Sequence, residues 1–563
     1  MPPQNATCRL INYVFLVQLL LFLLQVDGRI TVTSPTVPSQ SFGGSGNGVN
    51  CVVCTFIVGV ISQLRQLHHI SARDAANLYC SFMPPTYKII CNAAGAFALR
   101  GAFDLIDENR SADVICRALL YCSSEKCHLF PRENKSSESV VELRKRYGWV
   151  SVPPVSIFDH LGSIYDLRAL RPDDDDDGDF FSTTTTSGGS YWRGRDCNDS
   201  DATVFPGRDS IDSERDENCN GVFGVDPKTG RTYEELWCSD SQPMGVIVVG
   251  DSASAHFGIP ADLVTVFEMS SRGYANIESI VRNSVDWPML SSFTGFRNTT
   301  EFEPNRNGPM ISVYSQLVER NRCNHRDFQN LGQNGATSGS VSHILRHVAR
   351  NRNASVKPAY LFISMVGNDV CLPPPHVMPP ETYYNNIVTS LSQADAFLPP
   401  GSHVLLVPLA DGRILYDSMH NRTHPIGSLH NDVTYANLYD FLACLDVNPC
   451  WGWLNTNETV RNITWERAAN LNKKLSQIVT ESQNKYQNFK VHLFDDVMAA
   501  AVKQFSGPVW ELVEPVDGFH PSQLASALVG KYMFSAMEKM GILPPENPHN
   551  GDIMRLFGNQ GGY

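Results

Sequence analysis

The chain has 563 residues, of which 42% are hydrophobic and 18% are charged, and its formal net charge is −13. This length predicts two or three domains, and the composition is typical of globular proteins and excludes a disordered chain. The negative charge argues against a nucleic-acid partner, because proteins that bind the phosphate backbone present basic surfaces.

The N-terminus has the pattern of a secretory signal peptide. Arg9 precedes an apolar segment at residues 13–26, and polar sequence begins at Asp27. A signal anchor is the alternative, but the apolar segment is shorter than the ~20 residues that span a bilayer. We expect removal of residues 1–28 and a secreted product in which residues 29–50 form a propeptide or linker. No later segment is expected to cross a bilayer.

Cysteine number and glycosylation sequons favour the same secretory route. Cys8 is one of fifteen cysteines, so loss of the signal peptide leaves fourteen, an even number that suits complete disulfide pairing. Sequons of the N-x-S/T type predict glycosylation at Asn109, Asn134, Asn298, Asn353, Asn421, Asn457 and Asn462.

Residues 51–127 are predicted to form a helical unit, because apolar side chains recur at helical spacing through residues 56–64 and 90–99. The cysteines of this unit fall as Cys51-x2-Cys54, Cys80-x10-Cys91 and Cys116-x5-Cys122. A zinc or redox role for the first pair would not explain the other four. The six-cysteine spacing resembles the saposin-like family.

This resemblance implies a small all-α, disulfide-stapled domain whose apolar faces contact lipids. It also implies the disulfide pairs Cys51–Cys122, Cys54–Cys116 and Cys80–Cys91. A role as a folding chaperone for the rest of the chain is the alternative to lipid contact, because small stapled domains often serve as scaffolds.

Residues 128–172 form a linker with a basic cluster, Leu143-Arg-Lys-Arg-Tyr147. Exposed segments of this kind are preferred sites of proteolysis, so we predict cleavage near Arg146 into a small and a large subunit. A disulfide is expected to join them, with Cys127 as the candidate because the saposin-like pattern leaves it unpaired. The pairing stays open among Cys127, Cys238, Cys323, Cys371, Cys444 and Cys450, although Cys444 and Cys450 are close enough to pair locally.

Residues 173–230 are an acidic region that predicts a calcium site. Asp173, Asp175 and Asp177 alternate and Gly178 follows, as in the first half of an EF-hand loop, where oxygen ligands converge on Ca²⁺. No glutamate occupies the twelfth position, so further ligands would come from a second cluster, which Cys197 and Cys219 would tie together. The candidate ligands are Asp173, Asp175, Asp177, Asp179, Asp196, Asn198, Asp199, Asp201 and Asp216.

Two features of this region leave alternatives open. A run of aspartates is also typical of a solvated acidic tract. Asn198 begins a sequon as well as lying among the candidate ligands, so it would either bind the ion or carry a glycan.

Residues 240–563 alternate between strand-like and helix-like segments. Short apolar runs predict buried strands at residues 246–249, 359–365, 404–409 and 491–494, and helices are expected at residues 340–351 and 465–484. This pattern predicts an α/β domain of three layers around a parallel sheet, in which ligands bind at the carboxyl ends of the strands.

Four short blocks follow these strands in a fixed order. They are Gly250-Asp251-Ser252, Asn330-Leu-Gly-Gln-Asn-Gly335, Gly367-Asn368-Asp369 and Asp517-Gly-Phe-His520. Together they resemble the four blocks of the GDSL (SGNH) hydrolases. The resemblance implies that Ser252 is a nucleophile, His520 its base and Asp517 the acid. It also implies an oxyanion hole formed by the Ser252 and Gly335 N–H groups and the Asn368 amide, with Gly332 as a competitor of Gly335.

The chemistry of ester cleavage requires these residue types. A serine hydroxyl is a weak nucleophile without an adjacent base, and an acid orients the imidazole and stabilises the imidazolium ion. His256 lies four residues after Ser252 and is the alternative base. We expect it to form part of the pocket wall, because a base usually reaches the nucleophile from another segment.

A saposin-like unit, an acidic calcium-type region and a GDSL hydrolase on one secreted chain resemble a family of two-subunit esterases that remove secondary fatty acyl chains from bacterial lipopolysaccharide. The resemblance implies detoxification of lipid A in vesicles or outside the cell. A cationic segment at residues 408–430, with Arg413, His420, Arg422 and His424, would suit lipid phosphates, and a solvated loop is its alternative. A secreted phospholipase or lysophospholipase and a non-catalytic lipid-transfer protein are the alternative functions.

Overall fold

The computed structural model describes residues 47–98, 102–131, 139–147, 171–172, 174–183, 192–350 and 355–563. The predicted signal peptide, most of the 29–50 segment, Asp173 and the sequons at Asn134 and Asn353 lie outside these residues.

A parallel sheet of five strands forms the centre of the larger unit, residues 240–563, in the order β2-β1-β3-β4-β5. Its strands are β1 (Gly245–Gly250), β2 (Phe328–Gly332), β3 (Ala359–Ser364), β4 (Ser402–Val407) and β5 (Phe489–Leu493). Strands β1, β2 and β3 are buried along their whole length, as expected where helices cover both faces of a sheet. Register pairs Gly250 with Gly332 and Ser364, which brings three carboxyl ends together.

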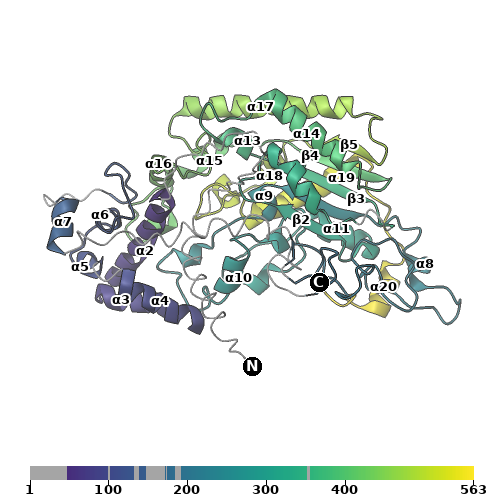
Figure 1. Cartoon of the computed structure of the whole chain (residues 1–563), viewed down its shortest axis with the longest axis horizontal. Coiled ribbons are helices and arrows are strands. Elements are labelled where there is room, and N and C mark those ends of the chain that lie inside the picture. The colour runs from purple at the N-terminus through teal and green to yellow at the C-terminus, as the bar shows by residue number, and fades with distance from the viewer. Residues whose placement is uncertain are drawn as a thin grey trace.

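Two groups of helices complete the predicted three-layer α/β architecture (Figure 1). Helices α14 and α17 pack on each other in one group, and α18 and α19 in the other. The helices that pack around the sheet are α11 (Val313–Arg320), α12 (Val341–Ile344), α14 (Pro380–Ala394), α17 (Glu458–Glu481), α18 (Val497–Gln504) and α19 (Gln523–Lys539). Shorter helices lie in the loops: α8 (Tyr233–Trp237), α9 (Ser252–Ala255), α10 (Ile277–Arg282), α13 (Asn368–Cys371), α15 (Arg413–Met419), α16 (Tyr435–Cys444) and α20 (Asn550–Phe557).

The predicted helix at residues 340–351 is wrong in its extent. Helix α12 passes into a 3-10 turn that ends at His347, and Val348 is extended. The side chain of Gln329 explains the break, because it accepts from the Ala349 N–H and donates to the Ala349 carbonyl, both at 2.7 Å. These bonds draw the chain out of the helix and onto strand β2.

The small unit, residues 51–127, is all-α and disulfide-stapled, and lies at one end of the molecule in Figure 1. Its helices are α2 (Asn47–His68), α3 (Ala72–Ser81), α4 (Pro85–Ala98), α5 (Ala102–Asp107) and α6 (Ala112–Ala118). Its disulfides join Cys51 to Cys122, Cys54 to Cys116 and Cys80 to Cys91, the pairs that the saposin-like resemblance implies. Helix α7 (Val140–Arg146) follows, so the basic cluster lies at a helix end rather than in extended sequence.

Helix α2 is the core helix of this unit. Over Gly48–His68 it is long and apolar enough to cross a membrane by length and composition alone, contrary to the expectation that no later segment would be. In the structure 72% of its apolar window is buried, and two disulfides fasten it to the segment around α6. The burial accounts for its apolar composition.

The two units are joined by a disulfide and by packing. Cys127 pairs with Cys444 at the end of α16, and Gln63 of α2 donates to the Ile426 carbonyl at 2.7 Å. Cys444 therefore does not pair locally with Cys450, which bonds instead to Cys371 at the end of α13.

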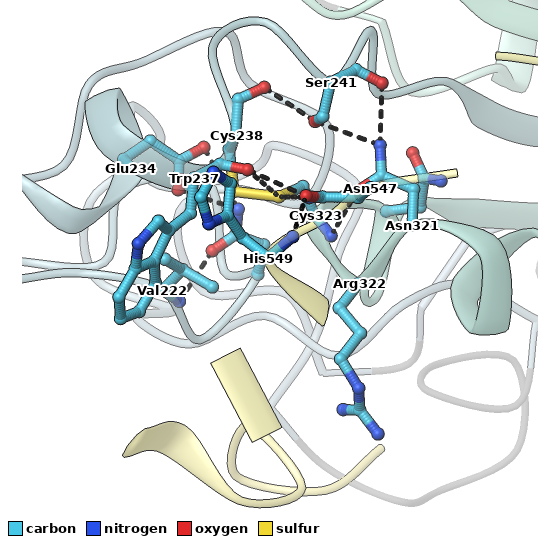
Figure 2. The surroundings of a disulfide bond; sticks show 12 residues. Val222, Glu234, Trp237, Cys238, Ser241, Asn321, Arg322, Cys323, Asn547 and His549 are labelled. Atoms are coloured by element: carbon cyan, nitrogen blue, oxygen red, sulfur yellow. Dashed lines mark hydrogen bonds between the residues drawn. A yellow bond between two sulfur atoms is a disulfide. The ribbon is translucent and has the colours of Figure 1, made fainter. Parts of the chain in front are cut away.

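The last open pair, Cys238–Cys323, anchors the C-terminal segment (Figure 2). Figure 2 shows Asn547 beside this disulfide, where its amide donates to the Trp237 carbonyl and to Asn321 Oδ1. In Figure 1 helix α20 lies at the lower right of the sheet unit, and the small unit lies at the left.

The Cys127–Cys444 bond predicts how the two units behave after proteolysis at the basic cluster. The cut protein should run as one species on a denaturing gel without reductant and as two species with reductant. Cys444→Ser should give two species in both conditions, because no other described disulfide joins the units. A single species after reduction would contradict processing, and joined Cys444→Ser fragments would contradict this link.

Candidate active site

Ser252 lies immediately beyond the carboxyl end of strand β1. The Asp251 carboxylate accepts from the Ala253 N–H at 3.1 Å and from the Val366 N–H at 2.8 Å, which caps the one-turn helix α9 and ties it to β3. Burial raises the pKa of Asp251 to about 6. Gly250 has no room for a side chain, since a Cβ there would lie 2.1 Å from Ser254 Oγ. The serine is thus held at the edge where strands β1, β2 and β3 end.

His520 and Asp517 meet this serine from the other end of the chain. Ser252 Oγ lies 2.7 Å from His520 Nε2, and His520 Nδ1 lies 2.5 Å from an Asp517 carboxylate oxygen. The other oxygen of Asp517 accepts from the N–H groups of Phe519 and His520 at 2.8 and 3.1 Å. A carboxylate beside Nδ1 favours the tautomer in which Nε2 accepts the serine proton.

Side chains from other segments hydrogen-bond the loop that carries Asp517 and His520. Tyr439 donates to the Gly518 carbonyl at 2.6 Å, and His424 Nε2 lies 2.7 Å from the Val516 carbonyl. Burial lowers the pKa of His424 to about 4, so this ring is neutral and its Nε2–H donates. The ring also contacts Phe56 of α2 edge-on, with centroids 5.9 Å apart. Sequence reasoning missed these supports, and counted His424 only as part of a cationic segment.

Gly335 and Asn368 lie beside Ser252 in the wall of one cavity, together with His520. Gly335 adopts a left-handed backbone with φ 75°, which favours glycine. Gly332 instead packs against α9, where a Cβ would lie 2.5 Å from the Ala255 nitrogen. Gly335 is therefore better placed than Gly332 to donate to an oxyanion.

Hydrogen bonds join the two segments that carry Gly335 and Asn368. The Asn368 amide donates to the Ala336 carbonyl at 3.0 Å, which leaves its second N–H for another acceptor. Asp369 accepts from the Ser338 N–H at 2.9 Å and from its hydroxyl at 2.7 Å. Burial raises the pKa of Asp369 to about 6. The disulfide Cys371–Cys450 fastens the same loop one turn later.

His256 is not the base, and it lines neither cavity beside Ser252. Helix α9 ends at Ala255, and His256 itself has a left-handed backbone with φ 59°, so its ring does not share a helix face with Ser252. Its Nε2 lies 2.9 Å from the Gln523 side-chain oxygen. Burial lowers the pKa of His256 to about 3, which keeps the ring neutral.

Two apolar cavities open on Ser252 and His520. The first is walled partly by Val52 and Phe56 of the small unit, opposite Leu438 and Leu442 of α16. The second is formed by the larger unit alone, and its lining includes Val366, Ile414, Leu415, Trp453, Met498, Val509, Leu512 and Val513. A reacting ester at Ser252 would therefore find apolar surface on both of its sides.

The two arginines of the cationic segment at residues 408–430 have different partners in the structure. Arg413 forms an ion pair with Asp411 at 2.6 Å. Arg422 stacks on Trp510, with its guanidinium carbon 3.5 Å from the ring centroid. Leu512, two residues after Trp510, lines the second cavity. Arg422 therefore stacks on a segment that borders this cavity.

The acidic region brings five of the candidate ligands together. Carboxylate oxygens of Asp177, Asp179 and Asp196 lie within 4.8 Å of one another, and those of Asp175, Asp177 and Asp199 do the same. Burial raises the pKa of Asp179 to about 8 and that of Asp196 to about 6, and neighbouring carboxylates add to both shifts.

Three other candidates have different surroundings. Asp201 bonds Thr203 and pairs with Arg215, Asp216 accepts from the Gly221 N–H at 2.8 Å, and Asn198 accepts from Ser200 at 2.8 Å. Asp201 and Asp216 do not belong to the carboxylate groups among the described residues. The expected Cys197–Cys219 disulfide is present beside them.

The chain resembles known proteins along nearly its whole length. A family model described as GDSL-like Lipase/Acylhydrolase matches residues 246–533, and one described as Saposin-like domain matches residues 50–154. The chain is 38% identical to the acyloxyacyl hydrolase of Mus musculus, over 97% of this chain and 98% of that protein. It is 39% identical to that of Oryctolagus cuniculus over 91% and 93%, and 37% identical to that of Homo sapiens over 94% and 96%.

The Ser252–His520 contact predicts a reactive serine. A fluorophosphonate should label Ser252, as mapped by peptide mass spectrometry, and His520→Ala should slow labelling ~100-fold or more, because a positioned base contributes ~10²–10⁴ in rate. His256→Asn should label at close to the unsubstituted rate. Equal rates for His520→Ala and the unsubstituted protein would contradict the assignment of the base.

Proposed function

The chain belongs to the acyloxyacyl hydrolase family and is an ester hydrolase, and we propose that it removes secondary fatty acyl chains from the lipid A of bacterial lipopolysaccharide. The observation that carries this proposal is the hydrogen-bonded series Ser252, His520 and Asp517 between two apolar cavities, one of which the saposin-like unit helps to form. Detoxification of endotoxin follows from loss of these chains.

The geometry supports a two-step acyl transfer. His520 Nε2 takes the proton of Ser252 as Oγ attacks the ester carbonyl, and Asp517 stabilises the imidazolium ion. The N–H groups of Ser252 and Gly335 and the free N–H of Asn368 would donate to the oxyanion, where one donor typically contributes ~3 kcal/mol. The imidazolium then protonates the departing alcohol. Water, activated by His520, releases the fatty acid and restores the Ser252 hydroxyl.

A secondary acyl ester has a chain on both sides of its reacting carbon, and the two cavities suit this shape. The cavity around Trp453 is lined by residues of the larger unit, which suits the acyl chain that leaves as fatty acid. The cavity with Val52 and Phe56 suits the hydroxyacyl chain that keeps the alcohol. Extraction of a chain from a lipid aggregate costs ~0.8 kcal/mol per methylene without an apolar receiver, so both cavities are required.

Acyl release from lipopolysaccharide tests the proposal directly. Mass spectrometry of lipid A after incubation should show loss of the secondary acyl groups only, and Ser252→Ala should abolish the loss. Faster hydrolysis of glycerophospholipids would favour a phospholipase instead. Lipid exchange that survives in Ser252→Ala, without acyl release by the unsubstituted protein, would favour a lipid-transfer protein.

We further propose that the acidic cluster binds Ca²⁺ as a structural ion. Asp177, Asp179 and Asp196 each keep one buried carboxylate oxygen without a hydrogen-bond partner among the described residues. Such oxygens are costly unless a cation pairs with them, and hard oxygen donors suit Ca²⁺. Asp175 and Asp199 complete the donor set. The ion would neutralise the repulsion among these carboxylates and fix the region to the sheet unit.

Chelation tests this site without any activity assay. EDTA should lower the thermal midpoint, and Ca²⁺ at ~100 times its Kd should restore ~2.7 kcal/mol. Asp179→Asn should remove most of the Ca²⁺ response. Asp226→Asn is the matched control, because Asp226 accepts only from local turn residues and should leave the response intact. A midpoint unaffected by EDTA and Ca²⁺ would contradict the site.

We also propose that the protein is secreted, or delivered to endolysosomal vesicles, as a glycosylated precursor that is cleaved between its units. Asn109, Asn298, Asn421 and Asn457 have exposed side chains that suit glycan attachment. Arg146 ends helix α7 and pairs with Glu108 at 2.8 Å, so cleavage there would first require this helix end to unfold.

A further inference from the structure

A buried ion pair lies between the two loops that form the catalytic centre. Arg306 and Glu514 are joined through Nη1 and Oε1, and their side chains are only 5% and 2% exposed. Neither residue belongs to the four GDSL blocks. Burying two charges costs free energy, so burial alone does not show that this pair stabilises the fold.

Arg306 reaches the segment that follows the nucleophile. Its Nη2 donates to the Gly258 carbonyl, which also accepts from Trp287 Nε1 at 2.9 Å. The guanidinium lies over the Trp287 ring, with its carbon 4.6 Å from the centroid. The residue before Gly258 is Phe257, whose N–H donates to the Ser252 carbonyl at 2.9 Å. The guanidinium group thus bonds the segment that directly follows the turn begun by Ser252.

Glu514 is at the base of the loop that carries the acid and the base. Its N–H donates to the His520 carbonyl at 2.8 Å, and its own carbonyl accepts from the Gly518 N–H at 3.0 Å. Arg306 therefore pairs with Glu514, whose backbone bonds both Gly518 and His520 of this loop. Phe257 packs on the His520 ring, with centroids 4.6 Å apart, so the two segments also touch directly.

Gly258 shows how closely the pair covers the nucleophile segment. A Cβ at this position would lie 2.3 Å from Arg306 Nη2 and 2.7 Å from Glu514 Cδ. Its backbone does not have a positive φ, so alanine would not strain the chain itself. The absence of a side chain here is needed for the contact with the ion pair.

We propose that Arg306 and Glu514 are positioning residues, whose buried pair joins the Ser252 segment to the loop of Asp517 and His520 and sets the separation of Ser252 Oγ from His520 Nε2. Displacing reacting groups by about 1 Å can cost ~100-fold in rate, so this tie acts on catalysis through His520. The inference rests on the proposed serine-esterase mechanism.

The test measures the labelling rate of Ser252 by a small fluorophosphonate, in which the serine oxygen bonds phosphorus, His520 takes its proton and fluoride leaves. This probe needs no lipid site. In the full-length protein, Arg306→Met and Gly258→Ala should each slow labelling ~10- to 100-fold per folded molecule. On a soluble short-chain ester, kcat should fall by the same factor while KM stays within about twofold.

Two further variants separate positioning from stability. Arg306→Met with Glu514→Leu replaces the ion pair by apolar groups, so the thermal midpoint should recover while labelling stays slow. Arg350→Met breaks another buried ion pair, to Asp327 at 2.8 Å before strand β2, at the opposite end of the sheet. It should lower the thermal midpoint and leave the labelling rate of folded protein unchanged.

Other outcomes would overturn the proposal. The labelling rate could be unchanged in folded Arg306→Met and Gly258→Ala, or fully recovered in the apolar double variant. Either result would show that the pair contributes only packing. If the unsubstituted protein is not labelled, both the proposed esterase mechanism and this inference are contradicted. If it is labelled but the variants are labelled equally fast, only the role of the ion pair is contradicted.

Discussion

The hydrogen bond between Ser252 Oγ and His520 Nε2 joins two residues 268 positions apart, and the architecture of the larger unit serves to hold it at 2.7 Å. The serine depends on the register of β1 with β2 and β3, because Asp251 caps α9 and ties it to the start of the β3 loop. The histidine lies on a loop outside the five described strands, closed by an isolated bridge between Val513 and Pro521. Its geometry comes from side chains around it, above all Asp517, Tyr439 and His424.

The saposin-like unit is connected to this loop through few intermediates. Phe56 of α2 contacts the ring of His424, which bonds the Val516 carbonyl next to the catalytic acid. The Cys127–Cys444 disulfide fastens the same unit to the end of α16, the helix that carries Tyr439. A unit that forms one wall of the substrate cavity is therefore also packed against the support of the catalytic loop. One continuous set of contacts thus runs from helix α2 to the loop that carries Asp517 and His520.

The four blocks could be recognised from the sequence because they are local and each lies where a strand or helix begins or ends. The resemblance assigned Ser252, His520 and Asp517 to one site, and the structure places them in one hydrogen-bonded series. Strand β2 escaped prediction because two of its buried residues are polar, and Gln329 and Asn330 become tolerable there only through partners distant in the chain. The partner of Cys127 and the roles of His424 and Arg306 are likewise long-range properties, without a local pattern to reveal them.

The proposed mechanism depends on transfer of the acyl chain of a lipopolysaccharide ester to Ser252. Rapid acid quenching of the protein with lipopolysaccharide, followed by digestion and mass spectrometry, measures this directly. The peptide that contains Ser252 is predicted to gain the mass of one fatty acyl group, and the gain should decay as free fatty acid accumulates. Release of fatty acid while this peptide stays unmodified, or acylation of another residue, would contradict the account.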